Sequence, residues 1–486
     1  MDHESAVTSP VLPDGEIRPL TRAPARERWS WALYDFSNTI FSMNVATLYF
    51  VVWLESDLGA SDFQYSIANG VASVLVVLSI PVLGAISDAR RRRKSWVVGF
   101  TLASCLACGL IGVFGATSLP VMGTGVIGGA MRDPAWHPTI VALLPVLACF
   151  VIASYTYQAA QPFYNAMLPE LVPAEELGHL SGLGTAVGYV GSIVGVMLVA
   201  PFFTGELPLI GALPARFIGA LRSIFPFTSH GGRVSTFVPT GALFLLFSLP
   251  LFLFCRDHNP IRGSGPVRWK EAFSEVLNTL RESKKHPGAL RFIISTFVYQ
   301  DAIGTIVTFM AVYAVKAIGF AGGSEVPLFI VLTAPAIVGS YVAGVMVDRI
   351  GAKKTLQITL WIWVALLVAM AIAPSRNAFW VVGFALGLNF GGVGAAERPM
   401  ILALIPDAEA GRYFSLMLLS ARVAAIAGPF IWSITVWLVE PSFGSVMAYR
   451  AAVLTVAGMF IVALWILKGV PDARERTPRN ARPTAA

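Results

Sequence analysis

Five ionisable residues stand within long apolar stretches of this sequence of 486 residues. If such a stretch crosses a lipid bilayer, a charge at its centre costs at least about 2.5 to 3.5 kcal/mol on insertion scales, so the charge is expected to face a cavity or a partner. A carboxylate there can carry a proton or bind an amino group, and a guanidinium can bind an anion. The five residues are Asp35, Asp301, Glu397, Arg398 and Arg422.

Two of these carboxylates have polar neighbours on the same side of a predicted helix, where residues three or four positions apart lie together. Asp35 is joined there by Asn38, and Asp301 by Thr305. We expect both carboxylates to carry a proton or to bind an amino group. For Asp35 an alternative is open, because Trp29 and Trp31 are typical of a membrane boundary, where the carboxylate would pair with Arg26 or Arg28. Asp301 lies deeper in its stretch and is the stronger candidate for chemistry.

Glu397 and Arg398 follow the glycine-rich run 391–396, which can expose backbone groups of a helix to a cavity. We expect Arg398 to bind a substrate carboxylate and Glu397 to neutralise Arg398 when the site is empty. The alternative is a structural ion pair near the end of that helix. Arg422 is a second candidate for binding an anion, again with a structural role as the alternative.

A further stretch offers neutral hydrogen-bonding groups at spacings of about one helical turn, with Pro162 among them as a predicted kink. Such groups suit a polar organic solute better than a bare ion. They are Tyr157, Gln158, Gln161 and Asn165. The next stretch carries a stripe of small residues that lets another helix approach closely, either between moving halves or in static packing within one half. The stripe consists of Gly184, Gly188, Gly191 and Gly195.

The stretches that carry these residues are predicted to be membrane-spanning helices. Hydrophobic residues make up 56% of the chain and charged residues only 13%, whereas soluble proteins have about a quarter charged residues. A run of roughly 20 apolar residues crosses a hydrocarbon core about 30 Å thick as a helix. Twelve spans are predicted, at 31–54, 65–87, 96–116, 140–163, 181–203, 237–255, 290–316, 326–347, 355–373, 377–402, 412–438 and 444–467.

The basic residues indicate the orientation of the spans. The net charge of +7 is distributed by side of the membrane rather than gathered in one module, so it argues for topology and against a nucleic-acid partner. The positive-inside rule predicts that both termini are cytoplasmic, and we expect a bacterial inner membrane. The segment 207–227 has two arginines and three prolines and is expected at the membrane surface rather than across it. The spacing of the four cysteines predicts no metal site, and we expect no cofactor and a monomer among membrane lipids.

The spans form two related sets, which predicts an all-α membrane protein with two pseudo-symmetric halves of six helices each. Asp35 in the first span recurs as Asp301 in the seventh, and we expect the two to face each other across the halves. The string "GAISDARRRRK" after the second span recurs as "GVMVDRIGAKK" after the eighth. The N-terminal half carries an insertion near 117–139. The predicted divisions are a cytoplasmic segment 1–28, a first half 29–255, a loop 256–289 with a short amphipathic helix, a second half 290–468 and a disordered tail 469–486.

The two recurring loops resemble the signature of major facilitator transporters, in which a solute site lies between two six-helix halves. We expect Asp88 to accept hydrogen bonds from amides at the start of the eleventh span near Arg412, and Asp348 to do so at the start of the fifth span near 179–182. These contacts would hold the cytoplasmic face shut. The alternative is that the charges only set topology. The gate residues are Gly84, Asp88, Arg92, Arg93, Gly344, Asp348, Arg349, Gly351 and Lys353.

Four further strings, "ALYDFSN", "FYNAMLPELVP", "SGLGTAVGYVG" and "GGVGAAERPMILALIP", resemble the autophagy-related vacuolar effluxer family, also called the "unknown major facilitator" family. The resemblance implies a transporter, and yeast members of that family export amino acids. The sequence departs from the family in the tenth span, where Glu397, Arg398 and Pro399 stand in place of a Ser-Arg-Ser-like element.

These patterns together predict a secondary active transporter for a small polar organic solute, an amino acid being one candidate, working by alternating access and coupled to protons. No Walker-type loop, HExxH or GxSxG element is present, so we expect no enzyme. The fourth span lacks the arginine typical of proton-driven drug exporters, which argues against multidrug export. The alternatives are a transporter-like sensor or scaffold and a translocator of lipids or amphiphiles.

Overall fold

The structure is a computed structural model. It describes residues 22–58, 62–90, 92–117, 140–207, 211–225, 228, 231–257, 288–319, 325–373, 375–406, 409–424 and 427–472. The predicted insertion near 117–139, the amphipathic helix of the central loop and most of both polar ends lie outside these residues.

Helices of the first half follow the first six predicted spans, because a chain in lipid must satisfy its backbone hydrogen bonds within itself. The first span is α1 (Ala25–Phe41), continued by the π-helix η1 (Ser42–Tyr49), α2 (Phe50–Val52) and the π-helix η2 (Trp53–Asp57). The others are α3 (Asp62–Arg90), α4 (Arg93–Thr117), α5 (Ile140–Ala166), α6 (Leu177–Phe203) and α8 (Phe237–Phe254). Short 3-10 turns are η3 (Leu168–Glu170), η4 (Ala174–Glu176) and η5 (Arg233–Thr236).

Helices of the second half follow the other six predicted spans. They are α10 (Ala289–Tyr313) with the π-helix η6 (Ala314–Ile318), α11 (Glu325–Ile350), α12 (Ala352–Ile372), α13 (Arg376–Leu402), α14 (Ala410–Ala424) and α15 (Ala427–Lys468). Within α15 the backbone leaves the helical region at Gly444, with φ 79° and ψ 166°, and this kink separates the eleventh span from the twelfth. Glycine adopts such a positive φ without steric cost.

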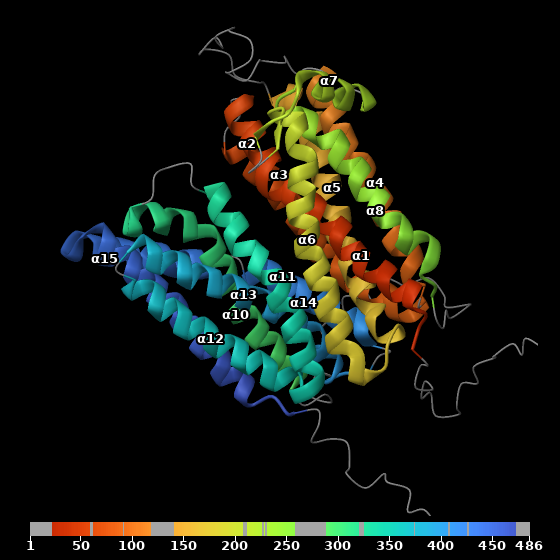
Figure 1. The fold of residues 1–486 in the computed structure, drawn as a ribbon. Coiled ribbons are helices and arrows are strands. Elements are labelled where there is room, and N and C mark those ends of the chain that lie inside the picture. Colours follow the sequence, from red (N-terminus) through yellow and green to blue (C-terminus); the bar gives the residue numbers. More distant parts are fainter. Residues whose placement is uncertain are drawn as a thin grey trace, which may run out of the picture.

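Eight helices among the described residues are long and apolar enough to cross a membrane by length and composition. The fold class predicted from the sequence is confirmed: the chain is a multi-pass all-α membrane protein of two six-helix halves. Figure 1 shows α1 to α8 on one side and α10 to α15 on the other, with the halves in contact along α6 and α11 and spreading apart toward the end where α7 lies.

The glycines of α6 divide between the two faces of that helix. A Cβ at Gly191 would lie 2.3 Å from the Phe36 carbonyl oxygen of α1, so this part of the stripe packs statically within the first half. A Cβ at Gly182 would instead lie 2.8 Å from Gly344 Cα of α11, so the contact between the halves is made about two and a half turns earlier. The four residues of the predicted stripe therefore serve packing on α1, and glycines before it serve the contact between halves.

The described residues of the segment 207–227 form no helix long enough to cross the membrane, as predicted. It contains a two-stranded antiparallel hairpin of β1 (Glu206–Leu207) and β2 (Gly211–Ala212), followed by α7 (Ala215–Ile224). A helix of ten residues is about 15 Å long, half of a hydrocarbon core. Arg222 Nη2 donates to the Phe202 carbonyl at 3.0 Å, which places a cation at the C-terminal end of α6, and burial lowers the pKa of Arg222.

Candidate functional site

A cavity of about 370 Å³ lies between the two halves, bounded by α1, α5 and α6 on one side and by α13 and α14 on the other. Its size is at the small end of the range of ligand pockets. The lining residues are Asp35, Thr39, Gln161, Pro162, Asn165, Thr185, Gly188, Tyr189, Gly394, Glu397, Arg398, Phe414, Met417 and Leu418.

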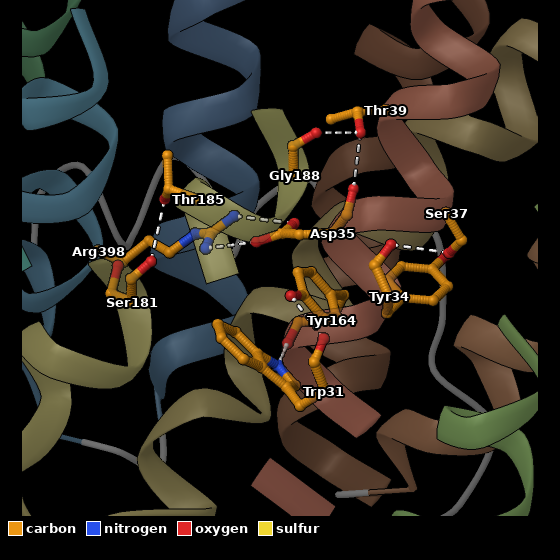
Figure 2. A network of polar contacts seen from close by, with 10 residues as sticks. All are labelled: Trp31, Tyr34, Asp35, Ser37, Thr39, Tyr164, Ser181, Thr185, Gly188 and Arg398. Carbon is orange, nitrogen blue, oxygen red and sulfur yellow. Dashed lines mark hydrogen bonds and ion pairs between the residues drawn. The ribbon is translucent and has the colours of Figure 1, made fainter. Parts of the chain in front are cut away.

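An ion pair between the halves stands in the wall of this cavity. The Nη1 and Nη2 atoms of Arg398 lie 3.0 and 3.3 Å from the Oδ2 and Oδ1 atoms of Asp35, so the guanidinium binds the carboxylate with two parallel hydrogen bonds. Figure 2 shows the two groups facing each other, from α13 and from α1. Both side chains are largely buried, with 17% and 9% of their surfaces exposed. Bidentate pairs of this kind are the strong ones.

The predicted partner of Arg398 was wrong. Glu397 accepts a hydrogen bond from Gln300 Nε2 of α10 at 2.7 Å, and it is Asp35 that neutralises Arg398. The physical reason is helix geometry, because successive side chains of a helix point about 100° apart. Glu397 is thereby directed to a helix of its own half, and Arg398 to the first half.

Two aromatic rings hold the guanidinium from below in the view of Figure 2. Trp31 and Tyr164 are stacked with ring centroids 4.7 Å apart, and the Arg398 guanidinium carbon lies 5.5 and 5.7 Å from their centroids. Trp31 Nε1–H donates to the Tyr164 carbonyl at 3.2 Å, and the Tyr164 hydroxyl donates to the Trp31 carbonyl at 3.1 Å. The rings thus join α1 to α5 and favour a cation at this position.

These contacts exclude the alternative interpretation of Asp35 as a carboxylate at the membrane boundary. Trp31 is fully buried, so it does not mark the lipid interface. The nearby arginines have other partners: Arg26 lies over the Phe254 ring at 4.5 Å, and Arg28 lies 3.8 Å from Glu176.

Two polar side chains that line the cavity each have an atom without a hydrogen-bond partner among the described residues. The Nε2 atom of Gln161 and the Oδ1 atom of Asn165 are buried and have no hydrogen-bond partner among the described residues, and both side chains line the cavity. One is a donor and the other an acceptor. Tyr157 and Gln158, predicted with them, do not line it: the Tyr157 ring packs 5.0 Å from Phe41. Asn38 is buried and is likewise not among the lining residues.

Asp301 occupies a different environment from its counterpart Asp35. Its Oδ2 accepts from the Gly428 amide at 2.6 Å, at the start of α15, and the Thr305 hydroxyl donates to the Asp301 carbonyl at 2.8 Å. Asp301 is buried within the second half and does not line the cavity. The expectation that the two aspartates face each other was therefore wrong, because Asp301 satisfies an amide that the first turn of a helix leaves unpaired. The side chain of Arg422 lies outside the described part of the structure.

The contacts expected of the recurring loops are found where the structure describes them. The carboxylate of Asp348 accepts from the amides of Gly178 and His179 at 2.9 and 2.8 Å, which ties the end of α11 to the start of α6. In the related position, a Cβ at Gly84 of α3 would lie 3.1 Å from Arg412 Cα of α14. The side chain of Asp88 lies outside the described part of the structure.

The basic residues of these loops differ in burial and in the groups they contact. Arg93 is buried and donates through Nη1 to Glu170 Oε1 and to the Ala166 carbonyl, both at 2.6 Å, so it acts within the first half and not between the halves as predicted. Its neighbour Arg92 is exposed. Lys353 is half-buried and donates to the Lys468 carbonyl at 3.4 Å, and Gly351 turns the chain between α11 and α12 with φ 95°.

Solved structures identify the class of this architecture. The transporter FucP in its outward conformation matches with a TM-score of 0.63 at 14% identity, covering 91% of this chain and 98% of FucP. The human organic anion transporter MFSD10 matches with a TM-score of 0.62 at 14% identity, covering 91% and 100%. At this identity the likeness shows the fold alone, which is that of the major facilitator superfamily.

The family follows from the sequence. The family described as "Vacuole effluxer Atg22 like" matches residues 60–478, and the chain belongs to it. An uncharacterized MFS-type transporter of Bacillus subtilis, YxiO, is 23% identical over 452 residues, covering 91% of this chain and 94% of the relative. The multidrug resistance protein MdtG of Proteus mirabilis is 25% identical over 411 residues, covering 82% and 86%. These relatives are named as transporters and not as enzymes.

Proposed function

We propose that this protein moves a small polar organic solute across the membrane by alternating access, with the cavity between the halves as the solute site. The observation that carries the proposal is the ion pair of Asp35 and Arg398, which stands in the cavity wall and joins one half to the other. A buried ion pair adds little to stability, since desolvation offsets its attraction. Its position between two halves that must separate gives it a functional reason instead.

The contacts of Asp348 with α6 and of Gly84 with α14 support a cytoplasmic gate, closed in this structure. The loops at this end are the basic ones, which the positive-inside rule assigns to the cytoplasm. The halves spread toward the other end, which carries α7 (Figure 1), and we infer from this an outward-facing state of the carrier. Opening inward requires the loss of the Asp348 contacts.

An amino acid is the solute that we favour, and a proton is the coupling ion. The cavity of about 370 Å³ accommodates a solute of that size. It presents a cation in Arg398, a carboxyl in Glu397 and two neutral amides, which match a carboxylate, an ammonium and further polar groups.

Drug or amphiphile export is the second candidate, favoured by the relatives named for multidrug resistance and by the apolar side of the cavity. That side is formed by Phe414, Met417 and Leu418. An exporter of amphiphiles would bind apolar cations through these residues and would not depend on Arg398.

The test is thermal stabilisation of the purified protein by a panel of amino acids, organic acids and amphiphilic cations, because a bound ligand raises stability by about 2.7 kcal/mol at 100 times its dissociation constant. We expect a polar solute to stabilise the protein and to be transported in proteoliposomes. Arg398→Ala should abolish both effects, whereas Arg291→Ala, which removes an exposed arginine bonded to the Gly469 carbonyl, should change neither. Stabilisation by amphiphilic cations alone, retained in Arg398→Ala, would overturn the proposal.

A further inference from the structure

We propose that the solute carries a carboxylate that displaces Asp35 from Arg398, and that Asp35 then takes up a proton, so that one proton moves with each carboxylate. This inference rests on the proposed function, since it places the solute in the cavity between the halves.

The first step concerns competition for one cation. Arg398 is the only cationic side chain among the described residues that line the cavity. Its planar guanidinium offers paired donors that match a carboxylate, and Asp35 now occupies two of them at 3.0 and 3.3 Å. The Trp31 and Tyr164 rings lie beside the guanidinium and restrict its movement. A solute carboxylate that takes these two donors from the cavity replaces Asp35.

The second step concerns what Asp35 meets once it is displaced. The ionisable groups that interact with it electrostatically, besides Arg398, are Tyr34 on its own helix, Tyr164 on α5 and Tyr189 on α6. The next ionisable group is Glu397, an acid already bonded to Gln300. None of these groups is a cation. A buried carboxylate without a cation costs several kcal/mol, and a proton removes that cost.

The packing of α6 leaves Asp35 little freedom to find another partner. A Cβ at Gly184 would lie 2.9 Å from Asp35 Oδ2, so the backbone of α6 runs directly against the carboxylate. Asp35 itself is 6% exposed. Protonation in place is therefore the available response.

The charges balance through the cycle. In the empty site Arg398 carries one positive charge and Asp35 one negative charge. In the loaded site Arg398 faces the solute carboxylate and Asp35 is neutral, so the sum is again zero. The proton enters from the water on the open side together with the solute and leaves when Asp35 returns to Arg398. A monocarboxylate thus moves with no net charge, and a zwitterionic amino acid moves with one positive charge.

The same exchange removes a contact between the halves. Asp35 packs on Gly184 of α6, and Gly178 of α6 bonds to Asp348 of α11, so the ion pair lies about 9 Å along the helix from the gate. Displacement of Asp35 from Arg398 frees α1 from α13 at this level. The solute therefore favours the separation of the halves that releases it.

The rest of the solute is expected to carry a hydroxyl or amino group. Gln161 Nε2 and Asn165 Oδ1 line the cavity without hydrogen-bond partners among the described residues, and together they offer one donor and one acceptor. A small hydroxy acid or amino acid satisfies both these atoms and Arg398.

The experiment is calorimetric titration of the purified full-length protein with glycolate, L-lactate, L-alanine and L-leucine, and with L-alaninamide as the analogue without a carboxylate. Each titration is run in two buffers of different ionisation enthalpy, which gives the protons taken up per solute bound. We expect one proton per carboxylate bound, affinity that falls about tenfold per pH unit once Asp35 is ionised, and no binding of L-alaninamide.

Two variants separate the roles of the two residues. Asp35→Asn should bind the same carboxylate without proton uptake and without pH dependence, and Arg398→Gln should lose the binding. If Asp35→Asn does not fold, the proton count of the unaltered protein still decides. Binding of a carboxylate without proton uptake, or no binding of any carboxylate probe, overturns this inference. The proposed function fails only if no solute of any class binds in an Arg398-dependent manner.

Discussion

Asp35 and Arg398 are separated by 363 positions in the chain and form a bidentate ion pair between the two halves. Each residue alone places an unfavourable charge within an apolar span. In the assembled protein each charge is compensated by the other. A buried ion pair whose partners belong to two moving bodies is a contact that transport must break and form again.

This pair predicts a strong coupling between two substitutions. Arg398→Gln leaves Asp35 buried without a cation, and we expect a loss of about 3 to 5 kcal/mol. The double variant Asp35→Asn with Arg398→Gln removes both charges, and it should recover most of that loss. Thermal unfolding of the four proteins in detergent measures the coupling. Equal losses in the single Arg398 variant and the double variant would contradict it.

The loss in Arg398→Gln is also expected to depend on pH. Without Arg398, Asp35 is the uncompensated group, and its protonation at low pH removes the unfavourable charge. Stability relative to the unaltered protein should therefore improve as the pH falls, and Asp35→Asn should abolish this trend. A stability difference that stays constant from pH 5 to pH 8 would speak against it.

Much of the fold could be predicted from the sequence. The length and apolarity of each span reflect the bilayer itself, so hydropathy was sufficient to place the helices of both halves. The kink at Gly444 falls between the last two predicted spans. The repeat placed Asp348 at the start of α6, because two halves with the same local pattern make the same contacts.

The site could be predicted only in part, since a cavity is defined by the partners that meet there. Arg398 was found as an anomalous charge, but its partner is 363 positions away and no local pattern points to it. Gln300, which donates to Glu397, was not predicted, because a neutral amide next to Asp301 carries no charge that would mark it as unusual within a membrane span. The position of Trp31 at the end of a span is typical of a membrane boundary, but its indole points into the protein and stacks on Tyr164.

The gate contact predicts a shift between conformations. Asp348→Ala removes the acceptor of the Gly178 and His179 amides, which should weaken the closed cytoplasmic end and raise the share of inward-open molecules. Labelling of a cysteine introduced at Ser340, a buried position whose backbone lies against Gly182 here, reports that share. Lys354→Ala, which removes an exposed lysine at the same end, is the control. Unchanged labelling in Asp348→Ala would refute a gating role.

The close approach of α1 and α6 predicts a selective loss of stability. A Cβ at Gly191 would lie 2.3 Å from the Phe36 carbonyl oxygen, so Gly191→Ala should force the helices apart at a cost of about 1 to 3 kcal/mol. Gly99→Ala on α4 is the matched control, because no atom lies within 4 Å of its Cβ position. It should be neutral or slightly stabilising in the same thermal unfolding assay. Two variants of equal stability would show that α1 and α6 can separate freely.

Asp301 and Asp35 should respond differently to the same conservative change. Asp301→Asn keeps an oxygen for the Gly428 amide, so stability and the pH dependence of solute flux are expected to remain close to those of the unaltered protein. Asp301→Ala leaves that buried amide without an acceptor, at a cost of about 1 to 3 kcal/mol. The measurement is solute flux in proteoliposomes at several pH values, compared between Asp301→Asn and the unaltered protein. Loss of the pH dependence in Asp301→Asn would contradict this prediction and would indicate that Asp301, in the second half, carries the coupled proton.

Adjacent arginines provide the last contrast. Arg93 is buried against Glu170, and Arg93→Ala would leave that carboxylate without its cation, at a cost of about 3 to 5 kcal/mol, as for other broken buried pairs. Arg92 is exposed one position earlier, and Arg92→Ala should change stability by less than about 0.5 kcal/mol. The Arg93 contacts lie within the first half. The folded fraction of the Arg93→Ala protein should therefore bind the solute with unchanged affinity. A change in solute affinity with normal stability would place Arg93 at the gate after all.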